Sequence, residues 1–274
     1  MTWSPRQLAM LQAMGLRQWA PSPAQHLAPQ AEPASPHAAA RSGGTAAVAV
    51  PVRPELAAPA PASSIVATQA QAQVGALDWT ALREAVADCR ACGLCQGRRQ
   101  TVFGVGHKQA HWMVIGEAPG EQEDLAGEPF VGAAGQLLDR MLQALNLSRS
   151  DDSGRAPEQC VYIANTLKCR PPRNRNPEPD EMAKCEPFLL RQIELVRPRM
   201  ILAMGRFAVQ ALLRSDQPLG KLRGRVHRYQ GVPLVVTYHP AYLLRNLPEK
   251  AKAWDDLCLA ADHLERLSRG QDAT

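Results

Sequence analysis

The strongest constraint on the fold is a regular alternation between short apolar runs and amphipathic helical patterns from residue 78 onward. Strand-like apolar runs are found at 112–115, 161–164, 200–203, 226–229 and 234–237. Helical spacing of apolar residues is found at 78–88, 133–145, 179–196, 206–213 and 252–267. Strands that alternate with helices favour a mostly parallel sheet with helices on both faces. We therefore expect an α/β protein, a three-layer α/β/α sandwich around a central, mostly parallel sheet.

A long N-terminal extension precedes this alternating pattern. Residues 18–77 consist mainly of Ala, Pro, Gln and Ser, so they have few large side chains to bury and are expected to remain disordered. Residues 1–17 begin with a helix-start signal, Ser4 followed by Pro5. This short helix is either a docking peptide for a protein partner or a helix that packs back on the core. The folded domain is expected to span residues 78–274.

The charge and hydropathy of the chain exclude some classes of protein. From residue 78 on there are 27 basic and 24 acidic residues, a mild excess that does not by itself indicate a nucleic-acid-binding protein. No run of about 18 apolar residues predicts a membrane span, and the N-terminus lacks a basic start followed by an apolar run. We expect a monomeric cytoplasmic protein with no membrane segment.

Five of the seven cysteines have the spacing of metal ligands. Cys89 and Cys92 form a Cys-x-x-Cys pair, Cys95 repeats the spacing, and Cys169 and Cys185 follow in a distant segment. Two such pairs can bind a structural zinc ion or an iron–sulfur cluster, and the spacing does not choose between them. Cys95 is the expected spare, although a set with Cys95 in place of Cys169 or Cys185 stays open.

The remaining two cysteines, Cys160 and Cys258, stand alone in apolar surroundings. We expect them to be core residues, because an isolated cysteine behaves as a small apolar side chain. Disulfides are not expected, since a reducing compartment favours metal ligands or buried thiols.

An acidic loop, "GEAPGEQEDLAGEPFVG" at 116–132, follows the expected strand at 112–115. Gly-rich loops after strands often bind phosphate. This one carries five carboxylates, on Glu117, Glu121, Glu123, Asp124 and Glu128, which is the wrong charge for that role. Because active sites of parallel sheets lie beyond the carboxyl ends of the strands, we expect this loop and the segment near residue 239 to share one rim.

A basic loop, "KCRPPRNRNPEP", contains Lys168, Arg170, Arg173 and Arg175 within eight residues. Its prolines prevent a helix. A stiff basic loop that is anchored by a metal ligand suits contacts to backbone phosphates. A solvated surface loop explains the charges equally well, so both interpretations stay open from charge alone.

Three separated motifs carry a family resemblance. "GEAPGEQEDLAGEPFVG", "YIANTLKCRPPRNRNPEPDE" and "HPAYLLRN" together resemble the iron–sulfur class of uracil-DNA glycosylases, called family 4. The resemblance runs from about Cys89 to the final helix and leaves out residues 1–77. It implies an α/β/α sandwich that hydrolyses uracil from single- and double-stranded DNA and leaves an abasic site. It also implies a structural [4Fe–4S] cluster on Cys89, Cys92, Cys169 and Cys185, with Cys95 extra.

The resemblance also implies roles for residues of the acidic loop and the following strand. Glu117 and Glu123 would line the pocket, with Glu123 favoured as the carboxylate that orients the water. Ala118 occupies the position where other uracil glycosylases carry an Asp. Phe130 would lie on the face of a flipped-out uracil, and Asn165 would read its O4 and N3–H.

The segment "HPAYLLRN" supplies the remaining expected roles. A neutral His239 would donate a hydrogen bond to O2 of the departing uracil. Leu243 would wedge into the base stack, at a cost of a few kcal/mol per unstacked step. Arg245 would contact a phosphate, together with Arg170, Arg173 and Arg175 of the basic loop.

Two other functions remain as alternatives. A non-catalytic or covalent uracil-DNA binder would carry a basic, His-containing insertion, but the interval "TLKCRPPRNRNPEPDEMAKC" is short and has no His. A repair adaptor would use the N-terminal helix and keep the core as a decayed enzyme, yet Glu123, Phe130, Asn165 and His239 are all present. No Lys stands where a Schiff base would form, so we expect a monofunctional hydrolase without strand cleavage.

Overall fold

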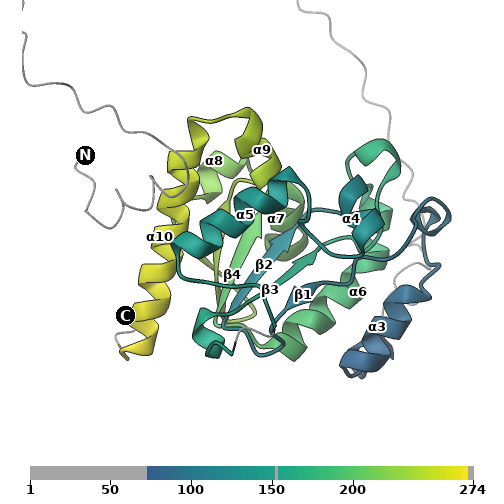
Figure 1. Ribbon diagram of the computed structural model, residues 1–274, viewed down its shortest axis with the longest axis horizontal. Coiled ribbons are helices and arrows are strands. Elements are labelled where there is room, and N and C mark those ends of the chain that lie inside the picture. The colour runs from purple at the N-terminus through teal and green to yellow at the C-terminus, as the bar shows by residue number, and fades with distance from the viewer. Residues whose placement is uncertain (1–72, 152–153, 271–274) are drawn as a thin grey trace, which may run out of the picture.

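The computed structural model describes residues 73–151 and 154–270 as a sheet between two layers of helices (Figure 1). Its six strands have the order β1-β3-β2-β4-β6-β5. They are β1 Val105–Gly106, β2 Trp112–Gly116, β3 Val161–Asn165, β4 Met200–Met204, β5 Val226–Tyr229 and β6 Val232–Thr237. The four central strands pair in parallel, and β1 and β5 add antiparallel edges. The predicted sandwich with a mostly parallel sheet is confirmed.

The helices lie where the periodicity places them, with several additions. They are α3 Trp79–Ala87, α4 Glu121–Ala126, α5 Ala133–Ala144, α6 Pro179–Val196, α7 Arg206–Leu213, α8 Leu219–Leu222, α9 Pro240–Arg245 and α10 Glu249–Ser268. Three short 3₁₀ turns are η1 Gly93–Gln96, η2 Pro157–Gln159 and η3 Pro172–Asn174. The sequence reading lacked β1, α4, α8 and α9. These elements are too short for a periodic signal, and α4 and α9 lie in two of the motifs.

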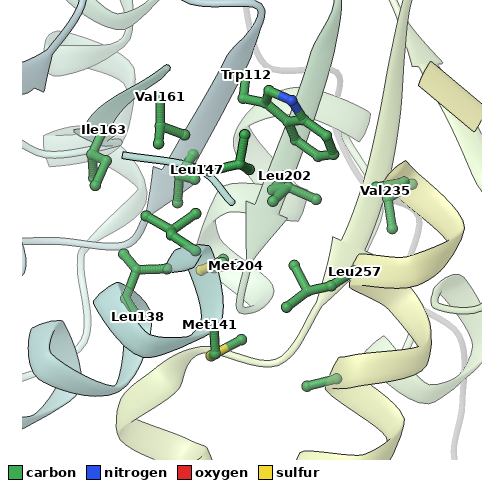
Figure 2. Close-up of a cluster of buried hydrophobic side chains, with 14 of the residues drawn as sticks. Trp112, Leu138, Met141, Leu147, Val161, Ile163, Leu202, Met204, Val235 and Leu257 are labelled. Carbon is green, nitrogen blue, oxygen red and sulfur yellow. The ribbon is translucent and has the colours of Figure 1, made fainter. Parts of the chain in front are cut away.

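Each central strand is buried on both faces, so its residues alternate between two cores. Figure 2 shows Val161, Leu202 and Val235 of the sheet facing Leu138 of α5 and Leu257 of α10. The intervening residues of the strands face α6 and α7 on the other side of the sheet, with Leu189, Ile193, Val209 and Leu212. Burial on both faces explains why these strands are continuous apolar runs in the sequence.

A capping residue fixes the start of α3, and α6 accommodates a proline in its interior. The Asp78 carboxylate accepts a hydrogen bond from Ala81 N at 2.9 Å and caps α3. Pro187 lies inside α6, where it removes one backbone hydrogen bond. The helix continues beyond it because Leu189 and Ile193 pack against the sheet.

The described chain begins before the predicted domain boundary at residue 78. Val74 and Leu77 pack against a small core that contains Leu82 and Phe188. The Leu77 carbonyl accepts a hydrogen bond from Arg191 Nε at 2.7 Å. The predictions for residues 1–17 and for most of the linker lie outside the described residues. Among the helices that the structure describes, none is long and apolar enough to cross a membrane.

The parallel strands bring four chain segments to one edge of the sheet. In register, Gly116 of β2 lies opposite Asn165 of β3, and Met204 of β4 lies opposite Thr237 of β6. The segments that follow these strands carry the acidic motif, the basic loop and the His239 motif. The topology therefore gathers all three motifs at the carboxyl edge, as expected for a parallel sheet.

Candidate active site

A cavity of about 670 Å³ opens at this carboxyl edge. Of the residues that the sequence singled out, its lining includes Glu117, Ala118, Glu123, Phe130, Asn165, Arg175, His239 and Arg245. Side chains that are more than 100 positions apart in the chain thus share one wall. The predicted catalytic and base-binding residues all lie together in this cavity.

Phe130 is held in an unusual backbone conformation beside His239. Its φ is 57°, in the left-handed region, and its side chain is buried. Its ring stacks on His239 with centroids 5.3 Å apart and 28° between the planes. The Phe130 carbonyl accepts a hydrogen bond from Arg149, and a Cβ atom at Gly135 would lie 1.7 Å from that carbonyl oxygen. Gly135 is therefore required for this approach of α5 to the acidic motif.

Asn165 lines the same cavity and carries a buried, unpaired acceptor. Only 2 % of the residue is exposed, and its Oδ1 has no hydrogen-bond partner within the described part of the chain. A Cβ atom at Gly116 would lie 2.4 Å from this oxygen and 2.6 Å from Phe130 Cζ. Leaving a buried acceptor unpaired is unfavourable by about 1–3 kcal/mol. Such a group is available to accept a hydrogen bond from a ligand.

His239 is fixed in one tautomer by the start of α9. It is the N-cap residue, and its Nδ1 accepts a hydrogen bond from Ala241 N at 3.2 Å. In the neutral ring this contact leaves the proton on Nε2, which is then a donor. Burial lowers the pKa of His239 to about 4, with Arg245 adding to the effect and Glu123 opposing it. The imidazole is therefore neutral at pH 7.

Glu123 is engaged by the backbone. Its Oε1 accepts hydrogen bonds from Val131 N at 3.1 Å and Gly132 N at 3.3 Å, and its Oε2 accepts one from Gly120 N at 3.1 Å. The carboxylate thereby caps α4 and ties that helix to the segment after Phe130. These contacts use most of the acceptor capacity of the Glu123 carboxylate. They therefore disfavour the sequence-based choice of Glu123 as the residue that orients a water.

Glu117 is the less committed carboxylate of the cavity. It is partly buried, and its side chain makes no ion pair or hydrogen bond with another residue of the described ranges. Burial raises the pKa of Glu117, and the nearby Arg206 cation opposes that shift. A partly desolvated carboxylate at the end of β2 is suited to stabilise positive charge or to accept a proton.

Lys168 differs from the three arginines of the basic loop because it is not available for a phosphate contact. It is only 1 % exposed, and its Nζ donates to the Asn165 carbonyl at 2.9 Å and to Gln192 Oε1 at 2.6 Å. Burial lowers the pKa of Lys168 to about 8. The Gln192 amide in turn donates to the Phe103 carbonyl and to the Tyr162 hydroxyl. Lys168 thus holds the backbone at Asn165 and is too deep to touch DNA.

The three arginines of the loop differ in their contacts. Arg175 makes two hydrogen bonds to Glu181, at 2.6 and 2.9 Å, so its guanidinium is largely committed within the protein. Arg170 donates to Asn174 and lies 3.6 Å from Glu121. Arg173 is exposed and makes no ion pair with another described residue. Of the three, Arg173 has the guanidinium that is best placed to contact a phosphate.

The wedge prediction for Leu243 needs correction. Leu243 is 1 % exposed and packs in the core between the sheet and α5 and α10. Its neighbour Leu244 is 41 % exposed, and Leu247 is 56 % exposed. The sequence could not separate these leucines because α9 was not predicted, and successive residues on a helix point in different directions.

The cysteine positions also converge. The side chains of Cys89, Cys92, Cys95, Cys169 and Cys185 line one small cavity between α3, the basic loop and α6. Arg98 Nη1 donates to Cys169 Sγ at 2.9 Å, and Lys168 N donates to Cys185 Sγ at 3.3 Å. No group of three or more His, Cys, Asp or Glu side chains in residues 73–151 and 154–270 is arranged to hold a metal ion.

The donor set nevertheless fits an iron–sulfur cluster, because four cysteine thiolates can bind a [4Fe–4S] cluster. Burial raises the pKa of the Cys169 thiol and raises that of Cys185 to about 12. Binding such a group would therefore release protons. Cys160 is fully buried and Cys258 packs against the other core, as expected for core residues.

Several cavity residues received no role from the sequence, among them Gly205, Arg206, Tyr238 and Tyr242. Gly205 and Arg206 directly follow β4, and Tyr238 directly follows β6. The rule that sites lie beyond strand ends could have found these three. Tyr242 required knowledge of α9.

Residues 103–258, more than half of the chain, match the family model of the Uracil DNA glycosylase superfamily. The chain belongs to this superfamily. A Type-4 uracil-DNA glycosylase of Archaeoglobus fulgidus is 42% identical over 167 residues, which cover 58% of this chain and 79% of that protein. One of Pyrobaculum aerophilum is 39% identical over 67% of this chain and 93% of its own length. One of Thermotoga maritima is 41% identical over 60% and 81%. The resemblance to family 4 is confirmed.

The burial of His239 leads to a prediction about pH. Its ring should titrate near pH 4 in the folded protein, below the ordinary 6.5. Between these values the unfolded chain binds more protons, so the contribution of His239 to stability falls as pH is lowered through this window. NMR titration of the imidazole, assigned with a His239→Ala variant, measures the pKa. A ring that titrates near 6.5 would contradict the burial of His239.

Proposed function

We propose that this chain is a monofunctional uracil-DNA glycosylase, which flips uracil out of DNA and hydrolyses its N-glycosidic bond to leave an abasic site. The observation that carries the proposal is the convergence of a stacking ring, an unpaired amide oxygen and an Nε2–H donor, from Phe130, Asn165 and His239, in one cavity. The relatives named as Type-4 uracil-DNA glycosylases support the same activity.

Uracil is recognised by its hydrogen-bonding edge and its flat face. The Asn165 amide donates to O4, and its Oδ1, unpaired within the described protein, accepts from N3–H. Cytosine presents the reverse pattern at these positions and leaves both groups unpaired, which strongly disfavours it. The Phe130 ring covers the face of the flipped base, whose unstacking is offset by these contacts.

His239 stabilises the leaving group. As the bond between C1′ and N1 breaks, the electron pair moves to uracil and negative charge develops at O2. The Nε2–H of the neutral imidazole donates to this oxygen, while Nδ1 remains bonded to the backbone of α9. A donor fixed in advance at the site of developing charge lowers the barrier without reorganisation.

Glu117 acts on the sugar side of the same bond. Positive charge develops on the deoxyribose as the base departs, and the carboxylate stabilises it electrostatically. A water then adds its oxygen to C1′ and gives a proton to the Glu117 carboxylate. Glu123 positions the acidic motif through its three backbone contacts, and Ala118 leaves room beside Glu117.

The DNA backbone and the gap in the stack are held by the rim of the cavity. Arg173 and Arg245 contact phosphates, with a smaller contribution from Arg170, whereas Arg175 keeps the loop in shape through Glu181. The exposed Leu244 takes the wedge role in place of the buried Leu243. Single- and double-stranded DNA are both substrates, because recognition requires only the flipped nucleotide and its backbone.

Cys89, Cys92, Cys169 and Cys185 hold a [4Fe–4S] cluster, with Cys95 spare. The bound cluster would supply a structural cross-link among the end of α3, the basic loop and α6. No lysine is among the residues that line the described cavity, and Lys168 is committed to Asn165 and Gln192. No Schiff base to the sugar is therefore expected. A protein partner for residues 1–17 stays a prediction.

The activity is tested with labelled single- and double-stranded oligonucleotides that contain one uracil. Wild-type protein should leave abasic sites, seen as strand breaks only after alkali. A His239→Ala variant should be slower by about 100-fold or more, because a fixed donor to developing charge is lost. The absence of abasic product from iron-loaded wild-type protein would refute the proposed function, and breaks without alkali would refute the monofunctional mechanism.

The two carboxylates are separated by a matched pair of variants. Glu117→Gln should lower kcat by about 100-fold or more with an unchanged melting temperature, since its carboxylate acts in the reaction. Glu123→Gln places an amide donor against a backbone donor, so it should destabilise the fold by about 1–3 kcal/mol and affect the rate less. Rates are measured well below both melting temperatures. The opposite result would assign the activation of the water to Glu123 in place of Glu117.

The cluster assignment is tested by metal analysis after anaerobic purification. Wild type and Cys95→Ala should contain iron and acid-labile sulfide, while Cys169→Ala should lose both because one of four ligands is missing. Zinc is measured in the same samples. Cluster loss in Cys95→Ala with retention in Cys169→Ala would reverse the ligand assignment, and zinc without sulfide would replace the cluster by a zinc site.

A further inference from the structure

An ordered pair of aromatic rings lies at the rim of the cavity, outside the contacts assigned to uracil. Tyr242, on the first turn of α9, is 38 % exposed. Its ring stacks on that of Tyr238, with centroids 5.1 Å apart and 27° between the planes. Both residues line the cavity. One face of the pair is therefore supported by the protein, and Tyr242 is available to solvent.

The support beneath this pair extends into the core. The Arg223 guanidinium lies 4.9 Å from the centroid of the Tyr238 ring. Arg223 Nε donates to Asp256 Oδ2 at 2.8 Å, and Asp256 is fully buried in α10. Asp256 also accepts a hydrogen bond from Gly224 N at 3.1 Å. These contacts hold the rings in place before any ligand binds, which reduces the entropy lost on binding.

The position of Tyr242 relates it to the flipped nucleotide. Its backbone N donates to the His239 carbonyl at 2.9 Å, so the two residues belong to the same turn. Leu244 and Arg245 are exposed on the same short helix. Tyr242 and Arg245 line the cavity, and Leu244 lies on the same helix. A flat ring, an apolar side chain and a cation match an unstacked base, a gap and a phosphate, respectively.

The chemistry of flipping creates a ligand for such a ring. When uracil leaves the stack, the neighbouring base loses a stacking partner and exposes one face. Aromatic side chains bind such faces with little dependence on sequence, because every base has a π surface. If Tyr242 served only in packing, an exposed aromatic ring with supporting contacts from Tyr238 and Arg223 would not be needed.

We propose that Tyr242, supported by Tyr238 and Arg223, is a stacking subsite for the base next to the flipped uracil. The ligand is a single unpaired nucleobase of the DNA strand that contains the uracil. This proposal rests on the proposed glycosylase function, because it places the flipped base in the adjacent cavity. It adds a subsite that strengthens binding of single-stranded DNA in particular, where no complementary strand holds the neighbour in place.

The test is a double-mutant cycle between protein and DNA. Single-stranded oligonucleotides carry one uracil with natural neighbours, or with an abasic spacer on its 5′ side or on its 3′ side. Wild type is compared with Tyr242→Ala and Tyr242→Phe, and Leu125→Ala, on α4 and 44 % exposed, is the surface control. Excision kinetics and fluorescence-anisotropy binding are measured for each pair.

Tyr242→Ala should lower kcat/KM on natural neighbours by about 5-fold or more, mainly through KM, which is the effect of losing one base–aromatic stack. Tyr242→Phe and Leu125→Ala should match wild type. With a spacer on one of the two sides, wild type should weaken to the level of Tyr242→Ala, and the variant should weaken no further.

An equal loss for Tyr242→Ala on all three oligonucleotides would overturn the subsite and leave a structural role. A Tyr242→Phe variant as impaired as Tyr242→Ala would also overturn it, since a phenyl ring stacks as well. The binding cycle keeps the two proposals distinct. If wild type excised no uracil, the proposed function would fail, while the anisotropy data would still show whether Tyr242 and the neighbouring base are coupled.

Discussion

The arrangement of the site depends on the close approach of three chain segments over Gly116. In the sheet, Gly116 pairs with Asn165, and the Phe130 ring lies above both. A single Cβ atom at residue 116 would overlap the amide oxygen and the ring. The absence of a side chain at the end of β2 therefore sets how near the Phe130 ring and the Asn165 amide can come. Backbone pairing of two parallel strands fixes this spacing more tightly than a loop could.

Glu117 and Glu123, two carboxylates of the acidic motif, have different local environments. The Glu123 carboxylate accepts hydrogen bonds from three backbone amides and stabilises the conformation of the motif. Glu117 has no such partners among the described contacts and faces the cavity with a raised pKa. His239 follows four strands later in the chain, where burial keeps its imidazole neutral and one backbone hydrogen bond orients the ring. Environment, not residue type, distinguishes a structural carboxylate from a reactive one.

The thiol-lined cavity and the base-reading amide share one short segment. From Asn165 to Cys169 the chain passes from the candidate active-site cavity to the cavity lined by the cysteines. Lys168 bridges the two, because its backbone N donates to Cys185 Sγ and its side chain donates to the Asn165 carbonyl. A group bound by the cysteines would therefore stiffen the strand end that carries Asn165.

The sequence by itself determined the fold class, five of the six strands, the longer helices and the family. Buried parallel strands and long amphipathic helices leave clear periodic patterns, and the three motifs at strand ends have a spacing that does not require a structure to read. It also placed Glu117, Phe130, Asn165 and His239 in one site. The tertiary structure decided which charges and leucines are available. Lys168 and Leu243 are buried, Arg175 is paired, and Tyr242 and Leu244 are exposed. Burial and pairing depend on which distant segments pack together, and the short helices α4 and α9 that orient these side chains have too few residues for a periodic signal.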